Sequence, residues 1–291
     1  MGSLAVATGS TFCPGATRAL GIARESLSQG NGRVYSFGAL IHNGPEVARL
    51  AALGLEVIDP EGGRLPELDG VQVILRAHGI DSRTEEMLRS LGAIIVDTTC
   101  PTVKEAQDAV ISLRESGCEV LLLGSPSHPE VKAIVGRAGG EVTVIEGVDG
   151  LDEWIDGRET MPDRVGVACQ TTLRQDFFDS VVDTLRPLVG ELEIRDTLCP
   201  HVLRRRKEAL GLCAGADLMI VVGGGNSSNT ANLAGICEKA GVKTYRVESA
   251  GEIMPEWVAG ASMVGVTGGA STPDWSMSEV IDRLRDLGLD G

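Results

Sequence analysis

The sequence lacks the features that would take it to a membrane or to nucleic acid. Its longest apolar runs, such as Val120–Leu123 and Leu218–Val222, are about five residues long, whereas a membrane-spanning helix needs about 20. The N-terminal residues lack the basic region and long apolar stretch of a signal peptide. The 291 residues include 41 acidic and 26 basic side chains, a net charge of −15 that repels phosphate backbones. We therefore expect a globular cytoplasmic protein that binds neither membrane nor nucleic acid.

The seven cysteines include no CxxC pair, which excludes the spacings of zinc ribbons, thioredoxins and ferredoxins. An odd number of cysteines without a secretion signal also disfavours a disulfide framework. Cys118, Cys169, Cys213 and Cys237 lie in or beside apolar segments, as small buried residues do. The 38 glycines exceed the usual share of about 7% and indicate many tight turns between strands and helices.

The other three cysteines share one local pattern, Thr-x-Cys-Pro, at residues 11–14, 98–101 and 197–200. Each follows a short apolar or alternating run and precedes a segment with helical spacing. Proline is favoured at the first position of a helix, and a thiolate is favoured at a helix N-terminus. Three occurrences indicate an internal repeat in which Cys13, Cys100 and Cys199 have the same role.

Polar motifs recur at matching distances from these cysteines. About 28 residues downstream, and again about 70 residues downstream, a run typical of a buried parallel strand ends in polar residues. In parallel α/β sheets, ligands bind outside the carboxyl ends of the strands. The motifs are Ile41–Asn43, Ser127–Glu130 and Asn226–Asn229 at the first distance, and Ala77–Gly79, Gln170–Thr172 and Ala270–Thr272 at the second.

The repeat predicts an α/β fold of three modules, over residues 1–97, 98–196 and 197–291, each with about four short parallel strands. If the modules pack around a pseudo-threefold axis, the cysteines converge and the six polar motifs line one central pocket. The alternative is that the motifs are ordinary helix caps, a common use of Ser, Thr and Asn.

Three converging thiolates leave two types of metal site open. One is zinc with an open coordination position, and the other is an iron–sulfur cubane in which one iron lacks a protein ligand. Neutral donors near helix N-termini suit a bound anion, and three of the four histidines, His42, His78 and His128, lie in the motifs. Glu130 supplies the only carboxylate there, as a proton donor or as an acid favoured in the first turn of a helix.

In order and spacing, over nearly the whole chain, these motifs resemble the 4-hydroxy-3-methylbut-2-enyl diphosphate reductase family. That resemblance implies a trefoil of three α/β domains around a central [4Fe-4S] cluster with one iron not ligated by protein. It also implies reductive removal of the substrate's allylic hydroxyl as water, which yields isopentenyl and dimethylallyl diphosphates. The segments that carry it are Phe12–Gly15, Leu40–Asn43, Ala77–Gly79, Asp97–Pro101, His128–Val131, Gln170–Leu173, Asn226–Asn229 and Gly269–Ser271.

The resemblance further implies a role for each residue of the motifs. Cys13, Cys100 and Cys199 would bind three irons, and the substrate hydroxyl would bind the fourth. Thr171 would position that hydroxyl and Glu130 would supply protons, with His128 also in the catalytic set. An acidic electron donor such as ferredoxin or flavodoxin would deliver electrons. The diphosphate would be held by His42, His78, His128, Ser227, Ser228, Asn229 and Ser271.

The chain departs from the family pattern mainly after Cys199. Val202 stands where a pocket-lining threonine is typical, and Ser10–Thr11 replace an Arg-Gly pair. These departures leave two alternatives: the same cluster acting on another substrate, or a non-catalytic cluster carrier or anion-binding module. The presence of Glu130 and Thr171 counts against the second alternative, because neither is needed to hold a cluster.

Three consecutive arginines, Arg204–Arg206, follow in the same segment. The simplest interpretation is a solvated helix face. The functional alternative is a basic docking patch for the acidic electron donor, which a protein of this net charge would otherwise repel.

Overall fold

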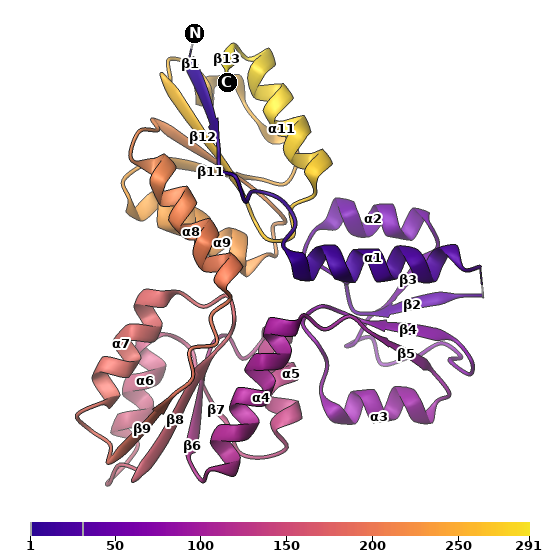
Figure 1. Cartoon of the computed structure of the whole chain (residues 1–291), viewed down its shortest axis with the longest axis vertical. Helices are drawn as coiled ribbons and strands as arrows, with labels where there is room; N and C mark the ends of the chain where they lie inside the picture. Colours follow the sequence, from indigo (N-terminus) through magenta and orange to yellow (C-terminus); the bar gives the residue numbers. More distant parts are fainter. Residues whose placement is uncertain (1, 31) are drawn as a thin grey trace. The chain divides into compact units, whose positions relative to one another are not determined.

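The computed structural model describes residues 2–30 and 32–291. Its strands form three parallel sheets, one of five strands and two of four (Figure 1), which confirms the predicted α/β class with short parallel sheets. The chain divides into two compact units. The first unit comprises the residues up to Arg24, Ala39–Gly54 and Pro200–Gly291, and the second comprises Glu25–Gly38 and Leu55–Cys199.

The first unit contains the five-stranded sheet, in the order β11-β10-β12-β1-β13. Its strands are β1 (Gly2–Val6), β10 (Leu218–Val222), β11 (Lys243–Val247), β12 (Met263–Gly268) and β13 (Leu289–Asp290). Helix α1 (Pro14–Ser28) begins in this unit. Its other helices are α2 (Gly44–Ala52), α8 (Pro200–Cys213), α9 (Ser228–Lys239), the 3-10 helix η1 (Ala250–Glu252), α10 (Pro255–Val258) and α11 (Asp274–Asp286).

The second unit contains the two four-stranded sheets, β3-β2-β4-β5 and β7-β6-β8-β9. The strands of the former are β2 (Val34–Phe37), β3 (Leu55–Ile58), β4 (Gln72–Leu75) and β5 (Ile94–Asp97). Those of the latter are β6 (Glu119–Leu123), β7 (Thr143–Ile145), β8 (Arg164–Cys169) and β9 (Glu191–Ile194). The helices are α3 (Ser82–Ser90), α4 (Pro101–Glu115), α5 (Pro129–Ala138), α6 (Gly147–Asp156) and α7 (Gln175–Leu185).

All three sheets have the same strand order. The order of β3-β2-β4-β5 and of β7-β6-β8-β9 recurs in the first unit as β11-β10-β12-β1, with β13 added beyond β1. The N-terminal strand β1 therefore completes the sheet built by the last part of the chain, where Val6 pairs with Val266. Each of Cys13, Cys100 and Cys199 follows the fourth strand of a sheet. The module boundaries after residues 97 and 196 stay a prediction.

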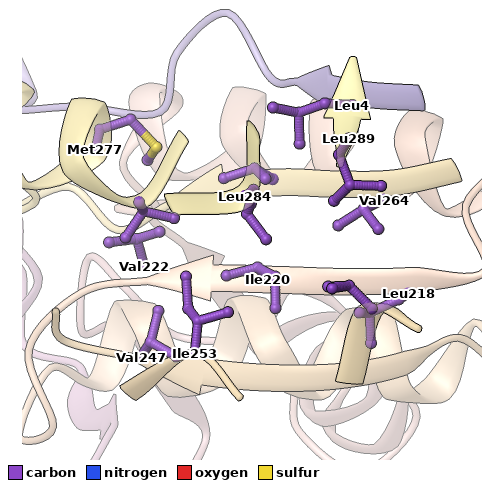
Figure 2. Packing of buried hydrophobic residues seen from close by; sticks show 13 residues of the cluster. Leu4, Leu218, Ile220, Val222, Val247, Ile253, Val264, Met277, Leu284 and Leu289 are labelled. Atoms are coloured by element: carbon purple, nitrogen blue, oxygen red, sulfur yellow. The ribbon is translucent and has the colours of Figure 1, made fainter. Parts of the chain in front are cut away.

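Alternation along β10 shows how one sheet is buried between helices. Leu218, Ile220 and Val222 pack on α11 (Figure 2), whereas Met219 and Val221 pack on α8 and α9. Successive strand residues point to opposite faces, so a strand covered on both faces needs a continuous apolar sequence. Figure 1 shows α11 on one side of this sheet and α8 and α9 on the other.

The local expectations at the cysteines are confirmed. Helices α1, α4 and α8 each begin at the proline that follows a cysteine. Cys118, Cys169, Cys213 and Cys237 are buried, while Cys13, Cys100 and Cys199 are partly exposed. In the described part of the chain, no helix is long and apolar enough to cross a membrane.

Gly268, the last residue of β12, allows two backbone segments to approach closely. A Cβ at this position would overlap the carbonyl oxygen of Ser10, in the turn that leads to Cys13. Overlap with backbone cannot be relieved by a rotamer change. A side chain at residue 268 would therefore push the Cys13 turn away from the sheet.

We predict that Gly268→Ala lowers the free energy of unfolding by roughly 1–3 kcal/mol, the usual cost of overpacking. Gly235→Ala in α9 is the matched control, because no atom lies within 4 Å of its added Cβ and alanine favours a helix. Urea denaturation of both variants and the wild type measures the effect. Equal stability of Gly268→Ala and the wild type would contradict the close approach.

Candidate active site

The three cysteines are held by equivalent backbone hydrogen bonds. Each cysteine N–H donates to a carbonyl oxygen in the polar motif that follows the neighbouring strand of its sheet. The N···O distances are 2.9 Å from Cys13 to Ala270, 3.0 Å from Cys100 to Ala77 and 2.9 Å from Cys199 to Thr171. Within each unit the fold thus joins a cysteine to the motif expected to bind substrate.

Side chains reinforce the turns at Cys100 and Cys199. Asp97 Oδ1 accepts the N–H of Thr99 at 2.8 Å, and the Thr98 hydroxyl donates to the Leu75 carbonyl oxygen at 2.5 Å. In the second turn, Asp196 and Thr197 make the corresponding bonds, to the Leu198 N–H (3.0 Å) and to the Cys169 carbonyl oxygen (2.6 Å). The sequence analysis did not assign these roles, although an Asp-Thr-x-Cys pattern common to both turns could have indicated them.

Glu130 and Thr171 form a buried pair in the second unit. Glu130 is 2% exposed and accepts the Thr171 N–H at 2.6 Å and the Thr171 hydroxyl at 3.0 Å. Burial raises the pKa of Glu130 from 4.5 to about 7, although the two hydrogen bonds from Thr171 oppose the shift. A carboxyl group with this pKa can both hold and release a proton near neutral pH.

His128 is the N-cap of α5 and lies beside His78. Its Nδ1 accepts the Glu130 N–H at 3.2 Å, so Nε2 is the nitrogen that carries the proton and can donate. The His78 and His128 rings meet edge to face with centroids 5.5 Å apart. These two histidines, one after β4 and one after β6, therefore lie side by side in the second unit.

The first unit also contains polar motifs. A cavity of about 240 Å³ is lined by His42 and Asn43, after β2, and by Gly224–Asn226, after β10. A Cβ at Gly224 would overlap the His42 carbonyl oxygen, so a larger residue could not occupy that position. The structure thus brings His42 to the loop that carries the predicted anion-binding residues.

The residues after this loop surround the start of α9. Ser227 is its N-cap and accepts the Thr230 N–H at 3.2 Å, which is also what an ordinary capping residue does. Ser228 is the first residue of the helix and is half-buried, as is Ser271 after β12. Asn229 is 6% exposed, and within the described residues its buried Nδ2 has no hydrogen-bond partner. An unsatisfied buried donor at a helix N-terminus suits an anion.

The arginine segment differs from both sequence interpretations. Only Arg204 is exposed, and it pairs with Glu208 one turn later at 2.9 Å. Arg205 and Arg206 are each 6% exposed, so the segment is neither a solvated face nor a basic docking patch. The prediction was wrong because the Arg205 guanidinium binds backbone carbonyl oxygens inside the first unit. Val202, on the same helix, is 3% exposed.

The three partly exposed cysteines fit a thiophilic metal group. They form no disulfide, and each lies at an equivalent turn directly before a helix N-terminus. Cys13 Sγ accepts the Ala16 N–H at 3.4 Å from the first turn of α1. By contrast, burial raises the pKa of the Cys169 thiol to about 12, which makes that residue a poor ligand.

Comparison with known proteins identifies sequence relatives over nearly the full length. A family model described as LytB protein matches residues 4–285. A 4-hydroxy-3-methylbut-2-enyl diphosphate reductase of Aquifex aeolicus is 37% identical over 290 residues, which cover 99% of this chain and 97% of the relative. The reductase of the same name from Geobacter metallireducens is 38% identical over 276 residues, with 95% and 94% coverage.

Two solved structures are similar in fold. One is (E)-4-hydroxy-3-methyl-but-2-enyl diphosphate reductase, described as the terminal enzyme of the non-mevalonate pathway. It is 37% identical, has a TM-score of 0.71, and the match covers 98% of this chain and 100% of the other. The other, E-1-hydroxy-2-methyl-but-2-enyl-4-diphosphate reductase from Plasmodium falciparum, has a TM-score of 0.88 at 23% identity, with coverage of 97% and 87%. At that identity it supports the fold alone.

We predict that the raised pKa of Glu130 makes the protein less stable as pH rises. The folded state binds a proton that the unfolded state has released between pH 4.5 and about 7, so the free energy of unfolding falls across that window. As the pH rises from 5 to 7.5, the free energy of unfolding of Glu130→Gln should increase by up to roughly 3 kcal/mol relative to that of the wild type. Urea denaturation at both pH values measures this change.

Glu105→Gln, at an exposed position of α4, is the control. Its free energy of unfolding should differ from that of the wild type by the same amount at both pH values. A Glu130→Gln difference that does not change with pH would show that Glu130 is ionised in the folded protein at pH 5.

Proposed function

The chain belongs to the LytB protein family, and we propose that it reduces 4-hydroxy-3-methylbut-2-enyl diphosphate to isopentenyl and dimethylallyl diphosphates. The reaction consumes two electrons and two protons, breaks the allylic C–O bond and releases the oxygen as water. The observation that carries the proposal is one cysteine-bearing turn, repeated after the fourth strand of each of three sheets.

Cys13, Cys100 and Cys199 are the ligands of the metal group in this proposal. A [4Fe-4S] cluster bound by three thiolates, with one iron not ligated by protein, supplies electrons and a Lewis-acid position when it is present. Three partly exposed cysteines at equivalent helix N-termini, none of them in a disulfide, are the donor set that such a cluster requires. The four buried cysteines take no part.

The substrate's diphosphate is proposed to bind neutral donors of the polar motifs. His128 presents Nε2–H because its Nδ1 is occupied by the Glu130 N–H, and Asn229 offers its buried amide group. Neutral donors at helix N-termini bind phosphate groups without requiring cationic side chains. The proposed set is His42, His78, His128, Ser227, Ser228, Asn229 and Ser271.

Glu130 and Thr171 are proposed to deliver protons. When Glu130 is protonated, its carboxyl group can donate to Thr171 Oγ1, and the threonine hydroxyl can then donate to the leaving oxygen of the substrate. The 3.0 Å distance between Glu130 Oε2 and Thr171 Oγ1 allows this relay. The pKa of about 7 keeps a protonated fraction available at neutral pH.

Two parts of the proposal concern the cellular setting. Electrons come from a small acidic donor protein such as ferredoxin or flavodoxin, and the reaction takes place in the cytoplasm. Neither Arg205 nor Arg206 can contribute to docking of that donor, since both are buried.

We predict that reconstituted protein binds roughly four irons per chain and absorbs near 400 nm, and that Cys100→Ser loses most of both signals. Cys237→Ser, at a buried position, is the control and should keep them. A colourless protein that binds zinc would contradict the proposed cluster.

We also predict that Glu130→Gln keeps the iron but lowers turnover by roughly 10²-fold or more, the usual contribution of a general acid. Anaerobic assays with a reduced viologen dye measure turnover and iron content in the same sample. Unchanged turnover in this variant would exclude Glu130 as the proton source. A loaded wild-type protein that does not turn over this substrate would favour the alternative of a different substrate.

A further inference from the structure

The turn that carries Cys13 lacks the carboxylate that holds each of the other two cysteine turns. Asp97 and Asp196 stand three residues before Cys100 and Cys199, and each accepts the N–H of the residue directly before its cysteine. The corresponding residue in the first turn is Ser10, whose hydroxyl donates to the Ala7 carbonyl oxygen at 2.5 Å instead. Ser10 has no carboxylate that could accept the N–H of the residue before Cys13, as Asp97 and Asp196 do in the other turns.

A second difference concerns the carbonyl oxygen at the end of the neighbouring strand. At the ends of β4 and β8, this oxygen accepts a threonine hydroxyl from the cysteine turn, Thr98 or Thr197. At the end of β12, the equivalent oxygen belongs to Gly268, and it accepts Nη1 of Arg205 at 3.0 Å. An arginine on α8 thus donates to the oxygen that accepts a threonine hydroxyl in the other two turns, although Thr11 stands at the position of those threonines.

The same guanidinium reaches two more carbonyl oxygens. Arg205 Nη1 lies 3.4 Å from the Gly269 carbonyl oxygen, and Nη2 donates to the carbonyl oxygen of Thr11, two residues before Cys13. One buried cation therefore joins the Cys13 turn to the loop that leads to Ser271. A buried charge is tolerated only where hydrogen bonds satisfy it, so these acceptors fix where the side chain can lie.

Glu208 lies three residues after Arg205 on the same face of α8, and it binds the start of the turn that leads to Cys13. Its carboxylate accepts the Gly9 N–H and the Thr8 hydroxyl, both at 2.9 Å. Burial alone would raise the pKa of Glu208, but hydrogen bonds from Gly9, Arg204 and Thr8 outweigh it and lower the pKa. Residues 8–11 are therefore held at both ends by α8.

We propose that Arg205 is the positioning residue for Cys13, with Glu208 in support. Arg205 replaces, from outside the turn, the restraint that Thr98 and Thr197 provide within the turns of Cys100 and Cys199. The inference rests on the proposed function, in which Cys13 binds the cluster. It makes the geometry of Cys13 depend on a cation from another element, α8.

The test compares Arg205→Met with Lys207→Met, which removes the same charge from an exposed position of α8. In the reconstituted protein, a chelator should remove the cluster roughly tenfold faster from Arg205→Met than from the wild type, since hydrogen bonds from a charged group are lost. Lys207→Met should behave as the wild type, and Arg205→Lys should lie between. Absorbance near 400 nm follows the loss.

Equal rates of cluster loss for Arg205→Met and the wild type would overturn the proposal. A Lys207→Met variant that loses the cluster as fast as Arg205→Met would also overturn it, because the effect would then come from the lost charge and not from the contacts that Arg205 makes.

A second readout does not need the cluster. In the full chain before iron is added, a thiol reagent should modify Cys13 roughly tenfold faster in Arg205→Met than in the wild type, relative to Cys100 and Cys199 on the same molecules. Faster modification of all three would indicate unfolding and overturn the proposal. If the wild type binds no iron, the proposed function fails, yet this ratio still decides whether Arg205 positions Cys13.

Discussion

One backbone hydrogen bond beside each sheet fixes where each of the three cysteines lies. It joins the N–H of a cysteine after the fourth strand to a carbonyl oxygen in the motif after the third. Parallel strands end at the same edge of a sheet, so this bond joins the segments that follow two neighbouring strands. The repeated strand order, the prolines that start the next helices and the close approach at Gly268 all serve to bring a thiol and a polar motif together.

Equivalent positions in the three turns are stabilised by different means. Thr98 and Thr197 satisfy the carbonyl oxygen at the end of a strand from within the turn. In the first turn, a guanidinium from α8 satisfies it, and the carboxylate of Glu208 accepts the Gly9 N–H at the start of the turn. The turn at Cys13 follows the N-terminal strand β1, and it is held by α8, the helix that follows Cys199 in the chain.

The repeat was predictable because strands, turns and cysteines recur at regular spacing. The pairing of β1 with β12 was not, since local pattern does not show that the first strand joins the sheet of the last segment. Arg205 was misjudged for a related reason. A run of arginines indicates exposure unless acceptors far away in the sequence bury it, and here they lie at Thr11 and Gly268. Glu130 was identified, but its pKa depends on burial that no motif reveals.

The most direct test of the account is anaerobic turnover of 4-hydroxy-3-methylbut-2-enyl diphosphate by protein that carries roughly four irons per chain, with a reduced viologen dye as electron donor. We expect oxidation of the dye together with formation of isopentenyl and dimethylallyl diphosphates. A fully loaded protein that oxidises no dye and forms neither product would contradict it.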